Sequence, residues 1–262
     1  MAAALQAAGS EIVGLAGRDA SLTADTIGGA DVVLVAVPDN ALMDVIDTIA
    51  KAPLARRAVV LYASGNADPG PALQRLRVKG HSAGTFHPLV PLAGSRGAAA
   101  QLRGAWVGID GDAEAQLAGR DLAKALGAHA IVIPAGVKPQ YHAAAVMASN
   151  FPVVLAAAAL GVLQGAGIDR ESARGMVLRL LRGAVDNLLS NDPAKALTGP
   201  VARGDADAVA VNLAAVAYDP ELVEAYRALT RLALRLVPLM PPGGPGQEQL
   251  DAIRSVLDRP YS

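Results

Sequence analysis

The chain has 262 residues, of which 52% are apolar and only 3% are aromatic. This composition permits a large core of small aliphatic side chains, but it leaves few aromatic rings on which nucleic-acid bases could stack. The net charge is −1 and no long run of like charge occurs, which argues against nucleic acid or a membrane surface as a partner. Cysteine is absent, which excludes disulfides, zinc–thiolate sites and thiol nucleophiles.

The first residues lack the charged region of a secretory signal, because no basic residue precedes Arg18. We therefore expect a cytoplasmic protein. Residues 143–163 are long enough to cross a bilayer. However, Ser149, Asn150 and Pro152 lie inside this run, and polar groups are costly within a membrane. We expect a central helix buried in protein and no membrane span.

In the first half of the chain, short apolar runs alternate with helix-like segments. The expected strands are residues 11–16, 31–37, 58–63, 82–87, 105–109 and 129–134. The expected helices between them are residues 40–51, 69–79 and 113–126. The last of these helices is expected to have Asp112 as its N-cap and Gly127 as its C-cap. The alternation predicts an α/β domain over residues 1–135, with a mostly parallel sheet and crossover helices.

After Pro134 no convincing strand follows. Helical periodicity runs through residues 138–165, 169–191, 206–217, 219–237 and 247–258. We therefore expect residues 136–262 to form an all-α C-terminal domain.

Three consecutive expected strands end in residues that could face a ligand. These are Val37, Pro38 and Asp39 after the second strand, Ser64 and Gly65 after the third, and His87 after the fourth. Open parallel sheets bind ligands at the carboxyl ends of their strands. Such residues are also common in ordinary loops, but three ends together favour a ligand-lined edge. We expect the first two groups to bind a cofactor. His87 is expected to act as an acid or base, with a structural role as the alternative.

A dinucleotide-binding domain normally opens with a strand and a G-x-G-x-x-G loop. Here residues 2–9 already resemble the first helix, so both features would lie upstream of Met1. Either the sequence begins downstream of them or the protein has lost them. Arg18 follows the expected strand 11–16 and is placed to pair with a 2′-phosphate, which favours NADP over NAD. The alternative is a solvated loop arginine.

The helix that opens the second domain carries polar groups in YHAAAVMASNF (141–151). In a helix, His142 and Ser149 lie within about 20° of each other, and Asn150 lies about 80° away. Each could be a core group satisfied by nearby backbone. At the start of the helical domain they are instead expected to face the cofactor cleft, with His142 and Asn150 catalytic and Ser149 binding substrate. The four histidines show no metal-site spacing, so no metal is expected.

The loop LTGPVARGDAD (197–207) is a second candidate site. Thr198 and Arg203 could hold a carboxylate or phosphate of a small-molecule substrate. The alternative is structural, because Asp205 or Asp207 could simply cap the helix that follows.

Several stretches together resemble one family. They are AVPDNAL (36–42), ASG (63–65), FHPL (86–89), GIDGD (108–112), YHAAAVMASNF (141–151) and LTGPVARGD (197–205). The family pairs a Rossmann-like NAD(P)-binding domain with a helical C-terminal domain of unknown function. Its layout is similar to that of the 6-phosphogluconate dehydrogenase and ketopantoate reductase superfamily. The resemblance implies an oxidoreductase that uses NADP, with NAD possible, and a homodimer in which the long central helix is shared between subunits.

One departure from the superfamily matters for the chemistry. Its hydroxyacid dehydrogenases carry a catalytic lysine four residues before an asparagine of the central helix. Asn150 matches that asparagine, but Val146 stands at the lysine position, so their proton transfer does not carry over. A non-catalytic nucleotide- or metabolite-binding regulatory protein on the same fold is therefore the competing hypothesis, and a purely structural dimer module is a third.

Overall fold

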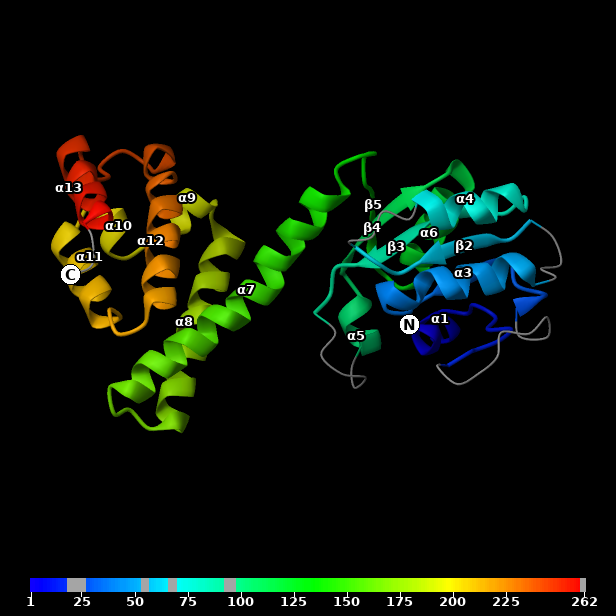
Figure 1. The fold of residues 1–262 in the computed structure, drawn as a ribbon, viewed down its shortest axis with the longest axis horizontal. Coiled ribbons are helices and arrows are strands. Elements are labelled where there is room, and N and C mark those ends of the chain that lie inside the picture. Colours follow the sequence, from blue (N-terminus) through cyan, green and yellow to red (C-terminus); the bar gives the residue numbers. More distant parts are fainter. Residues whose placement is uncertain (18–26, 53–56, 66–69, 92–97, 260–262) are drawn as a thin grey trace. The chain divides into compact units, whose positions relative to one another are not determined.

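The computed structural model describes residues 1–17, 27–52, 57–65, 70–91 and 98–259. The chain divides into two compact units, Met1–Asn150 and Phe151–Ser262 (Figure 1). The division falls inside the long helix α7 (Lys138–Gly165), whereas the expected domain boundary precedes that helix. Arg18 lies outside the described residues, so its expected role stays a prediction.

A five-stranded sheet forms the centre of the first unit, and its strands follow one another across the sheet in chain order. The strands are β1 (Val32–Val35), β2 (Val59–Tyr62), β3 (Ser82–Pro88), β4 (Trp106–Gly111) and β5 (His129–Val132). All neighbouring strands are parallel except β3 and β4, which are antiparallel. The prediction of a mostly parallel α/β domain is confirmed.

The expected strand at residues 11–16 is wrong, because these residues have no regular structure. Gly14 interrupts the run, and glycine weakens a strand. Val13 and Leu15 are 50% and 73% exposed, so no core covers their side chains. An apolar run without a packed face and a strand partner gains too little to remain extended.

Helices cover both faces of the sheet. One face carries α3 (Leu42–Lys51) and α4 (Gly70–Val78), and the other carries α1 (Ala2–Ala7), α5 (Ala98–Leu102) and α6 (Ala113–Ala125). A short 3-10 helix, η1 (Asp39–Ala41), leads into α3. Successive strand residues point to opposite faces, so Val60 and Tyr62 join the core under α3 and α4 while Leu61 joins the core under α6. The strands are therefore buried on both sides, as their continuous apolar runs predicted.

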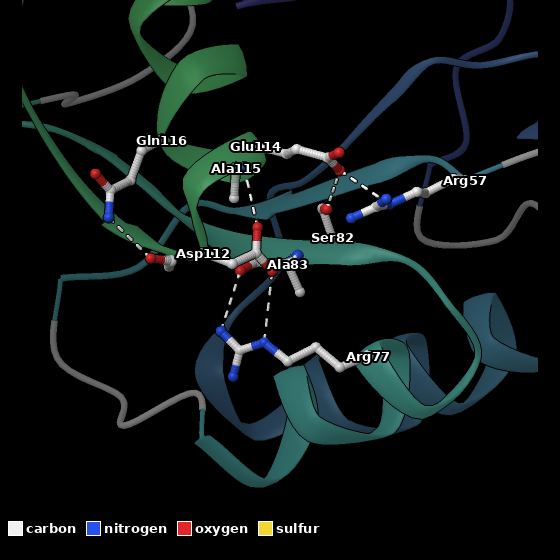
Figure 2. A network of polar contacts seen from close by, with 9 residues as sticks. Arg57, Arg77, Ser82, Ala83, Asp112, Glu114, Ala115 and Gln116 are labelled. Atoms are coloured by element: carbon white, nitrogen blue, oxygen red, sulfur yellow. Dashed lines mark hydrogen bonds and ion pairs between the residues drawn. The ribbon is translucent and has the colours of Figure 1, made fainter.

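Asp112 ties the start of α6 to the start of β3 (Figure 2). Its Oδ1 accepts a hydrogen bond from the N–H of Ala115 at 3.1 Å, which confirms the expected N-cap. Its Oδ2 accepts from the N–H of Ala83 at 2.9 Å and lies 3.5 Å from Nε of Arg77. The surrounding contacts of this network involve Arg57, Ser82, Glu114 and Gln116. The network anchors the beginning of the strand whose far end carries His87.

The described part of the second unit is helical, as predicted. After α7 it contains α8 (Arg170–Ser190), α9 (Pro193–Ala196), α10 (Pro200–Arg203), α11 (Ala206–Ala215), α12 (Pro220–Leu234), η2 (Val237–Leu239) and α13 (Gln247–Asp258). Its core is formed chiefly by α11, α12 and α13, with Val209, Val223 and Ile253 at most 2% exposed. The short helices α9 and α10 were not predicted, because four residues are too few to show a helical period.

Helix α7 leaves its apolar residues exposed in the single chain. Within the described ranges it is the one helix long and apolar enough to cross a membrane, with a mean hydropathy of 2.0. None of its most apolar window is buried. On α8, Leu180 and Leu189 are also 74% and 81% exposed. A single chain therefore does not supply the protein surroundings that we expected for the central helix.

Candidate functional site

The carboxyl ends of β1, β2 and β3 lie at one edge of the sheet, because these strands are parallel. Ser64 and Gly65 lie one residue beyond the end of β2 and are buried. His87 is the penultimate residue of β3 and is half-buried. Pro38 and Asp39 are exposed after β1, and Val37 beside them is half-buried. The fold thus places these predicted residues on one edge, where open parallel sheets bind ligands.

Tyr62 joins the ends of the first two strands. Its hydroxyl donates a hydrogen bond to Oδ1 of Asp39 at 3.1 Å. Burial, together with the nearby negative charge of Asp39, raises the pKa of Tyr62 to about 12, against an opposing hydrogen bond from Ser64. The phenol therefore stays protonated and holds Asp39 at neutral pH. Tyr62 was not among the predicted site residues. A tyrosine at the end of an apolar strand could have indicated one, because its hydroxyl can reach polar groups at the strand end.

Gly65 is required by the close approach of two histidine rings. A Cβ at this position would lie 2.5 Å from Cε1 of His87 and 2.7 Å from Nδ1 of His142. The centroids of the two rings are 6.1 Å apart. The structure therefore brings together three predicted site residues that come from β2, β3 and α7.

His87 is held by Tyr141, which comes from the first turns of α7. Nδ1 of His87 lies 3.1 Å from the Tyr141 hydroxyl, and the rings meet edge to face with centroids 5.6 Å apart. Burial, helped by the positive charge of nearby Lys138 and by His142, lowers the pKa of His87 to about 4, with Asp39 opposing. Burial also raises the pKa of Tyr141 to about 12. Both partners are neutral at pH 7, so His87 is not a proton-donating imidazolium there.

Tyr141 fits against the sheet because Gly108 of β4 leaves room for it. A Cβ on Gly108 would lie 2.4 Å from the phenol oxygen. One turn earlier on α7, Lys138 is buried, and its Nζ lies 4.0 Å from a carboxylate oxygen of Asp110. Lys138, Tyr141 and His142 are spaced i, i+3 and i+4, so one face of α7 carries all three. Sequence reasoning missed Lys138 and Tyr141 as site residues.

One ring nitrogen of His142, Nδ1, is buried without a hydrogen bond to any described residue. Buried polar atoms are nearly always hydrogen-bonded, and an exception calls for an explanation such as a ligand. The position of this nitrogen beside Gly65 and His87 makes a ligand atom a natural partner.

Ser149 and Asn150 lie farther along α7. Seven residues of helix separate His142 from Ser149 by about 10 Å. The Ser149 hydroxyl lies 2.7 Å from the carbonyl oxygen of Ala145 and 2.8 Å from Oδ1 of Asn150, so the helix itself satisfies it. Asn150 is exposed. The structure shows no contact between this pair and the histidine cluster among the residues it describes.

Thr198 and Arg203 belong to the second unit and are both exposed. Among the described residues, Arg203 forms a long ion pair with Asp205 at 3.9 Å, and its side chain is 64% exposed. Asp205 accepts a hydrogen bond from the N–H of Ala208 at 2.9 Å and so caps α11. The capping interpretation therefore holds for Asp205, while the guanidinium of Arg203 remains accessible to an anion.

A cavity of about 540 Å³ lies at the opposite edge of the sheet, where β3 begins. Its lining includes the charged network of Figure 2, namely Arg57, Arg77, Asp112 and Glu114. Arg57 forms an ion pair with Glu114, and Arg77 forms one with Asp112, which also caps α6. We therefore assign this cavity to the structural brace, and the strand ends to the candidate site.

The chain is similar to known proteins at the level of fold. Residues 105–233, slightly under half of the chain, match the family model described as a domain of unknown function, DUF2520. The structure is similar to that of protein TM1727 from Thermotoga maritima, with 25% identity, a TM-score of 0.66 and 80% of each chain covered. No curated protein sequence matches the chain.

Two further structures share the fold. A proposed NADP oxidoreductase from Bacteroides fragilis is 20% identical, with a TM-score of 0.64 over 81% of this chain and 78% of that one. An imine reductase from Myxococcus stipitatus, in complex with NADP+, is 15% identical, with a TM-score of 0.53 over 80% of this chain and 77% of that one. These likenesses establish a Rossmann-like α/β fold with a helical C-terminal part.

Proposed function

We propose that the protein is an NAD(P)-dependent oxidoreductase that transfers hydride to or from a small-molecule substrate. The observation that carries this proposal is the meeting of Gly65, His87 and His142 at the carboxyl edge of the parallel strands. The fold is shared with structures described as an NADP oxidoreductase and as a reductase bound to NADP+. NADP is the proposed cofactor, with NAD as the second choice.

The residues at the strand ends fit a nicotinamide cofactor. Gly65 has no side chain, so the rings of His87 and His142 can lie close to the strand end. Nδ1 of His142 has no hydrogen-bond partner among the described residues and can bind a ligand atom. Bound cofactor would supply or accept the hydride, which is chemistry that protein side chains lack. The chain's own task is then to orient the reacting groups, and His87 and His142 are placed to do so.

The substrate is proposed to carry an anionic group that Arg203 and Thr198 bind. Arg203 is exposed and only weakly paired, which leaves its planar donors available for a carboxylate or phosphate. Asn150 is proposed as a catalytic residue and Ser149 as a substrate-binding residue, on their helical spacing from His142 and on the family resemblance. The resemblance supports a place in the 6-phosphogluconate dehydrogenase and ketopantoate reductase superfamily. A cytoplasmic location is also proposed, since the absence of cysteine fits a reducing compartment.

A homodimer is proposed to cover the apolar surface of α7. Met147, Phe151, Val153 and Val154 are all more than half exposed in the single chain. A large apolar surface of this kind is typical of an interface between subunits. Sedimentation of the purified protein should give a dimer that Val154→Lys converts to monomer, and a wild-type monomer would contradict this part of the proposal.

Titration calorimetry with NADPH and NADH tests the function. We expect binding of NADPH with a Kd of roughly micromolar size and weaker binding of NADH. Absence of heat with both nucleotides would refute the proposal. Gly29→Ala is a suitable control variant, because among the described residues no non-adjacent atom lies within 4 Å of its added Cβ.

A non-catalytic regulatory protein on the same fold is the second candidate. Val146 stands where related dehydrogenases carry lysine, which favours this alternative. The two functions differ in one result. A regulatory protein would bind NADPH but would not oxidise it with any carbonyl or imine substrate offered, whereas an enzyme would.

A further inference from the structure

We propose that Tyr141 is a positioning residue that holds His87 in the tautomer with its proton on Nε2, which makes His87 a hydrogen-bond donor to the reacting group of the substrate. This inference rests on the proposed function and names the kind of substrate group that the site accepts.

The hydrogen bonds around the phenol determine the tautomer. Burial keeps the phenol of Tyr141 protonated at neutral pH, so it has one hydroxyl proton to donate. The single hydroxyl proton then has two possible acceptors, Nδ1 of His87 at 3.1 Å and the carbonyl oxygen of His87 at 3.5 Å. The shorter contact is within normal hydrogen-bond range, and the longer one is marginal. The hydroxyl proton is placed on the shorter contact, so that Nδ1 accepts it. A neutral imidazole that accepts at Nδ1 carries its proton on Nε2.

The position of the phenol is itself restrained. Gly108 leaves a slot that any Cβ would close, and the edge-to-face contact at 80° keeps the two rings at a fixed angle. Both groups are neutral at pH 7, because burial raises the pKa of Tyr141 to about 12 and lowers that of His87 to about 4. No proton passes between them at that pH, so the hydrogen bond sets an orientation and does not act as a relay.

The second ring nitrogen of His87, Nε2, is the one that Tyr141 does not contact. The described residues offer Nε2 no hydrogen bond, so Nε2–H can donate to a ligand. A bound nicotinamide cofactor would supply the hydride for the new C–H bond, and the π electrons of the substrate double bond would pass to its heteroatom. The Nε2–H donor stabilises the negative charge that develops there, and water supplies the proton that completes the product. A neutral imidazole can serve as such a donor without ionising.

This geometry selects the substrate class. A donor at Nε2 needs a lone pair opposite it, which a carbonyl oxygen has and a protonated imine nitrogen lacks. The site is therefore assigned to an aldehyde or ketone and not to a protonated imine.

Nitrogen-15 NMR of the histidine rings tests the tautomer without any need for activity. We expect the wild-type His87 signals, assigned with His87→Gln, to show the proton on Nε2. Tyr141→Phe should give a mixture of both tautomers. Tyr226→Phe, which loses a hydroxyl contact to Asn212 at 2.9 Å in the second unit, should leave the His87 signals unchanged. A wild-type His87 protonated on Nδ1, or a single unchanged tautomer in Tyr141→Phe, would overturn the inference.

Steady-state kinetics with NADPH and a panel of aldehydes, ketones and cyclic imines tests the consequence. Tyr141→Phe should lower kcat by about 10- to 100-fold with little change in the KM for NADPH. Tyr141→Phe combined with His87→Gln should be no slower than His87→Gln alone, because Tyr141 acts through His87. Additive losses, or turnover of imines alone, would contradict the inference. A protein with the expected tautomer that turns over none of these compounds would refute the proposed function instead.

Discussion

Gly65→Ala is the most direct perturbation of the histidine cluster. The added Cβ would lie 2.5 Å from Cε1 of His87 and 2.7 Å from Nδ1 of His142. Ordinary contacts begin at 3.4 Å, so the His87 ring would have to retreat by about 0.9 Å and the His142 ring by about 0.7 Å. The His87 ring is restrained by its 3.1 Å contact with Tyr141, which such a movement would disturb.

Overpacking of this kind costs about 1–3 kcal/mol. For a unit of this size that corresponds to a melting temperature lower by roughly 2–12 °C. Thermal unfolding by circular dichroism measures the loss, and Gly29→Ala, whose Cβ enters open space, should stay within about 1 °C of wild type. NADPH affinity should fall in Gly65→Ala but not in Gly29→Ala. If Gly65→Ala melts and binds like the wild type, the close approach of the two rings is refuted.

Three further predictions follow from the charges and caps of the described residues. Because the folded protein lowers the pKa of His87 from 6.5 to about 4, only the unfolded chain takes up this proton between those values, so stability falls as the pH falls through that window. Between pH 6.5 and 4, the free energy of unfolding of the wild type should fall by about 2 kcal/mol more than that of His87→Asn, allowing for partial solvation of the ring. Urea titrations at both pH values measure this difference, and equal losses in the two proteins would contradict the prediction. Asp112→Ala should lower the free energy of unfolding by about 2 kcal/mol, because it uncaps α6 and also leaves the N–H of Ala83 without its acceptor. Asp169→Ala, which only uncaps α8, should lower it by less, and equal losses would argue against the brace. Arg203→Ala should leave the melting temperature unchanged within about 1 °C, since the ion pair of Arg203 is long and exposed. It should weaken the binding of anionic substrates and leave that of neutral ones unchanged, whereas a loss of activity with all substrates would point to a different role.

The sequence predicted the strands that are covered on both faces. Val60 and Leu61 are fully buried on opposite faces of β2, and a continuous apolar run is the sequence pattern of such a strand. The run at residues 11–16 shows the same pattern over a shorter span, but Gly14 interrupts it and Leu15 is 73% exposed. Apolar composition alone does not distinguish a strand that has a partner from one that has none.

The candidate site was predictable only in part. His87 could be placed because it ends a parallel strand, and His142 because it begins the helix that opens the second half of the chain. The contact of Tyr141 with His87 joins residues 54 positions apart. It depends on the rotation of α7 about its axis and on the slot at Gly108, and neither can be derived from local spacing. Lys138 was missed for the same reason, since a lysine at a helix start is usually solvated.

Addition of NADPH to the ¹⁵N-labelled protein, followed by NMR, tests the central claim most directly. We expect the backbone amides of Ser64 and Gly65 and the ring nitrogens of His87 and His142 to shift on titration, while the amides of Ser82 and Glu114 at the opposite edge of the sheet remain in place. An unchanged spectrum at the strand ends, or shifts confined to Ser82 and Glu114, would contradict the assignment of the cofactor to this edge.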